Sequence, residues 1–234
     1  MEKVIYLLWR DPAISDDDFS RRLRSELAPR LQRLGARSLR INAADADVAP
    51  AAGLRQSVLK PAPDALAQVW LDSAIARFRK PVDDAVAAAT ARSAAYLVTE
   101  SQPLRNTKHP ARGGERTHGF AQIALLRRPE KLPYESWLDI WHNSHTDIAL
   151  ETQSTFEYVQ NVVVRRFNAD APALDAIVEE CFPPEAMKDY KVFFDAPGDE
   201  AKFKANLQRM MQSVSRFIEH GTIDVTPTSQ YPMF

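Results

Sequence analysis

The sequence has few of the residues that cross-link secreted domains or hold nucleotides. Its 234 residues include one cysteine, Cys181, which cannot form a disulfide within the chain, so we expect a reducing, cytoplasmic environment. Only seven residues are glycine, and no glycine-rich phosphate loop, nucleophile elbow or paired-cysteine motif occurs. We therefore expect no nucleotide cofactor held on a glycine-rich turn and assign no cofactor.

Long hydrophobic runs and a large excess of one charge are also missing. No stretch approaches the roughly 20 apolar residues of a membrane-spanning helix. The apolar run near the N-terminus lacks the small-residue cleavage site of a signal peptide. The formal net charge is -1, which argues against electrostatic attraction to nucleic acid. We expect no membrane partner and no nucleic-acid partner.

Two halves of similar size make up the chain. Residues 102–118 contain two prolines, two adjacent glycines and four basic residues, which is typical of a linker. This segment separates a first unit, 1–101, from a second unit, 119–234. The division predicts two domain-sized units rather than one continuous domain.

A single offset of 118 positions relates the two halves. It brings Leu23 onto Trp141 and Leu27 onto His145, at matching points on two amphipathic helical stripes. The same offset superimposes the apolar strand predicted at 4–9 on the one at 120–126. An offset that aligns both a strand and a helix predicts a duplicated unit.

Each half is expected to follow the order strand, helix, strand, strand, helix, strand. The predicted strands are residues 4–9, 37–41, 65–71, 95–99, 120–126, 158–166, 176–182 and 222–226. The predicted helices cover 19–34, 81–91, 137–149 and 203–217. We predict an α+β fold in which two tandem ferredoxin-like repeats (βαββαβ) form an α+β barrel. The barrel closes either within one chain or across a homodimer.

The first helix of the second half carries the most informative side chains. His145 occupies the apolar stripe at the position of Leu27, which predicts a partly desolvated, neutral imidazole able to move a proton. Trp137 and Trp141 share that stripe and are candidate walls of a substrate pocket. The alternatives are a core histidine bonded to a carbonyl and tryptophans that simply pack in the core.

Polar side chains within otherwise apolar strands are the remaining candidates for ligand contacts. We assign Gln122 and Tyr158 to substrate binding, and Gln68, Gln160 and Glu179 are weaker candidates on a barrel-lining face. Binding pockets are mostly apolar with a few placed polar groups, which suits this pattern. Edge positions and solvated strand ends are the alternative explanation for each residue.

A histidine pair on the same helix raises the question of a metal. His142 and His145 are three residues apart, and Asp147 follows closely. Two histidines at this spacing can meet on one helix face. Because the spacing supplies no third ligand and His142 lies off the apolar stripe, we predict no metal.

The same helix carries an aromatic residue, a tryptophan and then a histidine four residues later. The residues of the pattern are Trp137, Ile140, Trp141, His145, Ile148 and Ala149, with the acidic-to-Phe segment 199–203 before the last helix. This pattern resembles the EthD family, with Ile140 in place of an aromatic residue. The first half keeps Phe19 but lacks the tryptophan and the histidine, and it resembles a degenerate EthD-type repeat.

The resemblance implies a dimeric α+β barrel that acts on small hydrophobic compounds in catabolism or polyketide-type tailoring. Barrel relatives include cofactor-free monooxygenases, cyclases and decarboxylases. We therefore predict an EthD-like enzyme, of oxidoreductase or lyase type, that acts on a small hydrophobic, aromatic or polyketide-like molecule by proton transfer at His145. A non-catalytic ligand-binding or accessory protein is the alternative. A purely structural role would be favoured by a solid core beside His145.

Overall fold

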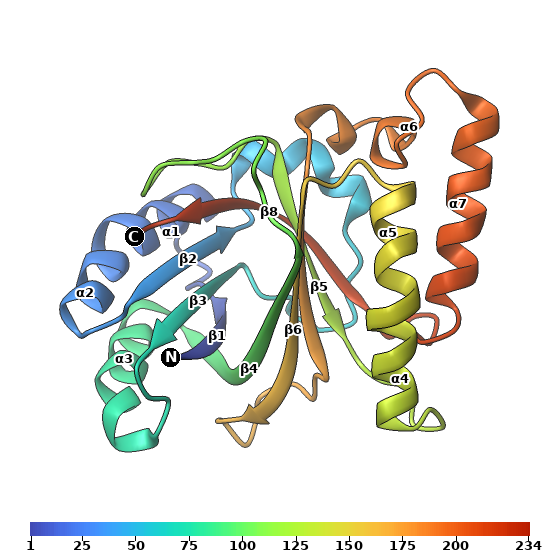
Figure 1. The fold of residues 1–234 in the computed structure, drawn as a ribbon. Helices are drawn as coiled ribbons and strands as arrows, with labels where there is room; N and C mark the ends of the chain where they lie inside the picture. Colours follow the sequence, from blue (N-terminus) through green and yellow to red (C-terminus); the bar gives the residue numbers. More distant parts are fainter.

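The computed structural model describes residues 1–234 and contains one closed barrel of eight antiparallel strands (Figure 1). The first half supplies β1 (Glu2–Trp9), β2 (Ser38–Ala43), β3 (Ala65–Leu71) and β4 (Arg92–Leu104). The second half supplies β5 (Phe120–Leu126), β6 (Glu157–Arg166), β7 (Ala176–Phe182) and β8 (Asp224–Pro232). All eight predicted strands are present, and the predicted α+β barrel is confirmed.

Strands follow the same order in both halves. The first half reads β4-β1-β3-β2 around the barrel and the second reads β8-β5-β7-β6. The halves join where β2 pairs with β8 and where β4 pairs with β6. The barrel therefore closes within one chain, which settles the alternative that the sequence left open. The homodimer is not needed for closure and stays a prediction.

Helices cover the outside of the barrel in two groups on opposite sides (Figure 1). The first group is α1 (Asp16–Arg22), η1 (Leu23–Leu27), α2 (Ala28–Arg33) and α3 (Ala76–Ala89). The second is α4 (Tyr134–Ile140), η3 (Trp141–His145), α5 (Thr146–Thr152) and α7 (Glu200–Val214). The short elements are η2 (Ala46–Leu54), η4 (Pro184–Met187) and α6 (Tyr190–Phe193). None of the helices combines the length and hydrophobicity that crossing a membrane requires.

A π-helical turn interrupts the first helix of each half at the same offset of 118. These turns are η1 and η3, in which the backbone N–H of Ala28 bonds to the carbonyl of Leu23 and that of Thr146 to the carbonyl of Trp141. Single π turns are frequent at functional sites because they re-aim side chains within a helix. In the second half, both Trp141 and His145 are buried by this turn.

Several boundaries differ from the sequence-based expectation; β8, for example, spans Asp224–Pro232 rather than 222–226. The helix predicted at 81–91 begins at Ala76, because the carbonyl of Ile75 accepts the first helical hydrogen bonds, and Pro81 lies inside it rather than in its first turn. The linker is also shorter than predicted, since 102–104 belong to β4. β4 is longer than predicted because it pairs with β6 where the two halves of the barrel join, and it must reach the start of β6.

Side chains on each strand alternate between the helix-covered surface and the barrel interior. One part of the interior is an apolar cluster that includes Ile5, Leu7, Leu66, Tyr96, Ile123 and Ile177. The other part is a polar network around Glu179, which accepts hydrogen bonds from Arg40 (2.6 Å), Asn42 (2.6 Å), Gln68 (2.8 Å) and Gln230 (2.8 Å). Gln68 and Glu179 are thus bonded to each other rather than to a ligand.

Candidate functional site

A cavity of about 750 Å³ lies between the sheet of the second half and its helices. Pockets that bind drug-sized ligands have volumes of roughly 300–1,000 Å³. Its walls are mainly apolar, and they include Ala124, Leu126, Trp141, Val178, Phe193, Phe194, Phe203, Leu207, Met210 and Phe217. Polar side chains reach it from strands and from helices: Gln122, His145, Gln153, Tyr158 and Glu180. The cavity lies beside His145, which counts against a purely structural role.

The first half contributes directly to the wall of this cavity. The end of η2 and the segment after it bring Gly53, Leu54 and Gln56 into the lining. Gln56 exchanges two backbone hydrogen bonds with Val225 of β8, and the carbonyl of Gly53 accepts a bond from the hydroxyl of Tyr190 (3.3 Å). The first half is therefore part of the site and not only a support for it.

Four of the five residues predicted for the site lie around the cavity. His145, Trp141, Gln122 and Tyr158 all line it. Trp137 is not among the residues that line it, and its role in substrate binding stays a prediction. This side chain lies behind Trp141, with ring centroids 5.3 Å apart, and its indole N–H donates to the carbonyl of Phe217 (3.1 Å). Trp137 is therefore a core residue.

His145 is held from one side by α7. Its Nδ1 lies 2.9 Å from the hydroxyl oxygen of Ser213, and its ring centroid is 4.6 Å from that of Phe217. Ser213 is buried and has no other side-chain partner, so its hydroxyl proton is satisfied by donation to Nδ1. We therefore assign the ring proton to Nε2. Burial, with the charge of Arg216 nearby, lowers the pKa of His145 to about 4.

Three paired strand residues form a polar row on the wall opposite the helices. Gln122 of β5 and Tyr158 of β6 both pair with Glu180 of β7. The only side-chain bond of Glu180 is a long one of 3.4 Å from the amide of Gln122, and burial raises the pKa of this carboxyl to about 7. Trp141 donates to the hydroxyl of Tyr158 (3.2 Å). We call Gln122, Tyr158 and Glu180 the polar row.

Glu180 is a functional candidate that the sequence reasoning missed. Along β7, Ala176, Val178, Glu180 and Phe182 face the helices, whereas Glu179 faces the barrel interior. The alternation of strand side chains was the signal that separates the two adjacent acids. Gln160 also faces the helices, where its amide donates to Thr146 (2.9 Å).

The first half has an apolar row at the same register. Val4 of β1 and Leu39 of β2 both pair with Val69 of β3. These three residues belong to a tightly packed apolar cluster that also contains Leu23 and Leu27, on the helix that covers this sheet. The polar row is therefore specific to the second half, as are the tryptophan and the histidine above it.

A second difference adds to the open space in the second half. Under the offset of 118, Ala124 of the cavity wall corresponds to Tyr6 of β1. Tyr6 is buried in the apolar cluster of the first half, and its hydroxyl donates to Asp83 of α3 (2.8 Å). A tyrosine therefore fills the space that alanine leaves open in the second half.

The raised pKa of Glu180 leads to an expected pH dependence of stability. Its carboxyl titrates near pH 7 in the folded chain, against an ordinary pKa of 4.5, so folding favours the protonated form. This contribution is fully present below the ordinary pKa and is lost as the pH rises through the folded-state value. From about pH 5 to about pH 8, the free energy of unfolding should fall more for wild type than for Glu180→Gln. Urea unfolding at both pH values checks this, and parallel curves would contradict it.

His142 lies outside the cavity lining. It is partly buried, its ring centroid is 4.7 Å from that of Trp141, and its Nε2 has no partner. Burial lowers the pKa of His142. The structure contains no group of three or more His, Cys, Asp or Glu side chains that could hold a metal ion.

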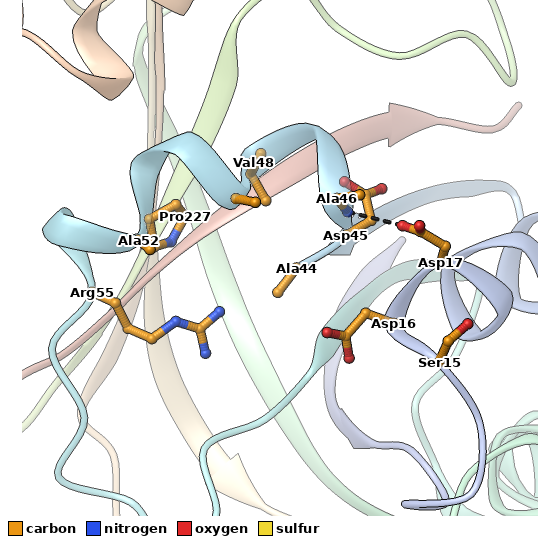
Figure 2. A pocket seen from close by; sticks show the side chains of 11 residues that line it. Ser15, Asp16, Asp17, Ala44, Asp45, Ala46, Val48, Ala52, Arg55 and Pro227 are labelled. Carbon is orange, nitrogen blue, oxygen red and sulfur yellow. Dashed lines mark hydrogen bonds between the residues drawn. The ribbon is translucent and has the colours of Figure 1, made fainter.

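A smaller hollow of about 360 Å³ lies beside the start of α1 (Figure 2). Asp16, Asp17 and Asp45 line it, together with Arg55. Asp17 accepts from the backbone N–H of Ala46 (2.8 Å), and Asp45 accepts from three hydroxyl groups of the surrounding elements. Asp16 also accepts from Arg10 (2.6 Å), so all three carboxylates hold the chain together, and we assign no ligand to this hollow.

Comparison with known proteins supports the fold. The sequence matches no profile of a known protein family, and no curated protein matches it either. Its structure is similar to that of a protein described as anthrone oxidase-like, with a TM-score of 0.56 and 9% identity over 99% of this chain and 92% of that one. A protein from Fusobacterium nucleatum, provisionally described as a monooxygenase, has a TM-score of 0.48 and 11% identity over 100% and 92% of the two chains. The first likeness shows that the two chains share a fold.

Proposed function

We propose that the chain is a small-molecule enzyme of the oxidoreductase type that works in the cavity between helices and sheet. A hydrophobic aromatic or polyketide-like compound binds there and loses a proton from an acidic C–H or O–H group, with His145 serving the transfer. The reaction is oxygenation without a cofactor, and cyclisation or decarboxylation would begin with the same proton loss.

The observation that carries this proposal is the contrast between two similar half-barrels. One half packs aliphatic side chains and a tyrosine between helix and sheet, and leaves only a smaller hollow of about 270 Å³ beside Leu23 and Leu27. The other half has a cavity at the corresponding place, with a histidine on the helix side and the polar row on the sheet side. Buried polar groups without full hydrogen bonding cost stability, so their presence on one side only favours a function there.

The fold and the sequence pattern agree with this assignment. The EthD resemblance of the second half and the anthrone oxidase-like neighbour both suggest oxidation of activated aromatic compounds. We also propose that the two halves are tandem ferredoxin-like repeats, and that the first is a degenerate EthD-type copy. The common offset of 118 in strands and π turns supports that origin.

Anthrone is a suitable probe because its methylene C–H is acidified by the aromatic ketone. In the proposed reaction, the base removes one proton and the carbanion forms a C–O bond with O₂. The resulting peroxide loses water, which takes the second hydrogen, and leaves anthraquinone. One molecule each of anthrone and O₂ thus gives one anthraquinone and one water, so the balance needs no other reductant.

Replacing His145 with leucine tests the role of the histidine. Leucine is the residue at the corresponding position of the first half, Leu27, so the apolar stripe is kept. We expect the rate of anthrone oxidation, measured as anthraquinone absorbance above the buffer background, to fall by about 100-fold or more. Thermal unfolding of both proteins serves as the control for folding. Full turnover by the folded variant would show that the assignment is wrong.

A ligand-binding protein without catalysis is the second candidate, because the enclosed apolar wall alone suffices to hold such a compound. The same assay distinguishes the two. Tight binding of anthrone that is released unchanged, at a rate independent of pH, would favour this candidate over the enzyme.

A further inference from the structure

We propose that Glu180 is the general base of the cavity and that His145 donates a hydrogen bond from Nε2 to the oxyanion formed when the proton leaves. The substrate is an uncharged aromatic ketone or phenol whose acidic C–H or O–H is conjugated to its oxygen. This assignment rests on the proposed function and divides the chemistry between two groups of the same site.

The surroundings of Glu180 suit a base that is kept free for a ligand. Its side chain is buried and lines the cavity, yet no lysine or arginine pairs with it. Its only partner is the amide of Gln122, at 3.4 Å. The adjacent Glu179 shows the contrast, because four side chains satisfy it in the barrel interior. A carboxyl with a pKa near the working pH exchanges protons most efficiently.

His145 is better suited to donate than to accept. Ser213 occupies Nδ1, which leaves the protonated Nε2 as the free ring nitrogen. Burial disfavours the imidazolium, as the lowered pKa shows, so a neutral imidazole gains little by taking a proton from carbon. A neutral N–H in a dry, apolar site stabilises a developing negative charge effectively.

The residues that line the cavity also restrict the charge and shape of the substrate. The lining contains no lysine or arginine, and its ionisable groups besides Glu180 are His145, Tyr158, Tyr190, Glu219 and His220. A carboxylate or phosphate on the substrate would therefore lack a cationic partner and would lie near two acids. Aromatic walls, including the edge-to-face pair Phe193 and Phe194, favour a flat uncharged compound instead.

The proposed step breaks the C–H bond of the substrate. Its proton moves to a carboxylate oxygen of Glu180, and the electron pair moves to the carbonyl oxygen, where the N–H of His145 holds it. Under argon in heavy water, this step alone exchanges the methylene protons of anthrone for deuterium. The exchange rate, followed by proton NMR above the buffer background, reports proton removal without the oxygen reaction.

We expect Glu180→Gln to slow this exchange by about 100-fold or more, because glutamine keeps the shape but cannot accept the proton. Anthrone affinity, measured by quenching of tryptophan fluorescence, should change little, since Trp141 remains in place. The wild-type rate should rise with pH to a plateau above about pH 7, and His145→Leu should be slower but keep that inflection. Glu135→Gln, on the exposed surface of α4, is the matched control and should exchange like wild type.

Four outcomes are informative. Loss of exchange in folded Glu180→Gln with retained affinity supports the assignment. Exchange in that variant at the wild-type rate, with the same inflection, overturns Glu180 as the base but leaves the proposed function standing. Wild-type protein that binds anthrone without exchanging its protons overturns the enzyme in favour of the ligand-binding candidate, and absence of binding overturns the proposed function itself.

Discussion

Replacing Arg40 with methionine should destabilise the protein by about 3–5 kcal/mol, because it leaves buried carboxylates without their cation. Arg40 bonds to Glu179 (2.6 Å) and to Glu157 (3.1 Å), and both acids are almost completely buried inside the barrel. Burial alone would raise the pKa of Glu179, but Arg40 and three amides outweigh it and hold that pKa below its usual range. Without Arg40, two neighbouring negative charges would have to share a desolvated site or become protonated.

The neighbouring Arg37 provides a matched control for that experiment. It pairs with Asp72 on the surface, where both side chains are mostly exposed and water screens the charges. Arg37→Met should therefore change the free energy of unfolding far less than Arg40→Met. Urea titrations of the three proteins at neutral pH measure both effects. Equal stability of the two variants would contradict the view that the interior network depends on Arg40.

The strands and their order were accessible from sequence because nearly continuous apolar runs mark buried strands. The offset of 118 located both π-turn helices, although only the structure shows the turns themselves. Closure of the barrel within one chain was not predictable. Closure depends on two strand pairs that join the halves, β2 with β8 and β4 with β6. The residues of an edge strand do not indicate which other strand it will pair with.

The site residues on the helix side could be predicted from the sequence, but those on the sheet side only in part. His145 stands out as a histidine on an apolar stripe, and Trp141 accompanies it. Trp137 lies on the same stripe, and nothing local distinguishes a cavity wall from core packing behind it. In β7, Glu179 and Glu180 are adjacent, and a shift of one residue in register exchanges the faces of the sheet to which they point.

The cavity itself was hidden because part of it depends on a side chain that is small. Ala124 stands where the first half has Tyr6, and an alanine in a strand is unremarkable in a sequence. We expect Ala124→Tyr to refill this space and to abolish anthrone oxidation, with turnover reduced by about 100-fold or more, since a blocked pocket cannot position its substrate. Overpacking costs typically about 1–3 kcal/mol, and the existing void should keep the loss at the low end.

Two further variants make this experiment decisive. Ala124→Leu adds less volume and should give an intermediate loss, which keeps the test valid if the tyrosine variant is unstable. Val164→Tyr adds a similar bulk at an exposed position of β6, outside the cavity lining, and should leave turnover unchanged.

The most direct measurement is a titration of wild type and Ala124→Tyr with anthrone, followed by tryptophan fluorescence. We expect one anthrone to bind to wild type and quench the emission, and Ala124→Tyr to bind it at least about tenfold more weakly while unfolding at a similar temperature. Equal affinity of the two proteins would contradict this expectation, because the compound would then bind somewhere other than the cavity beside His145 and Glu180.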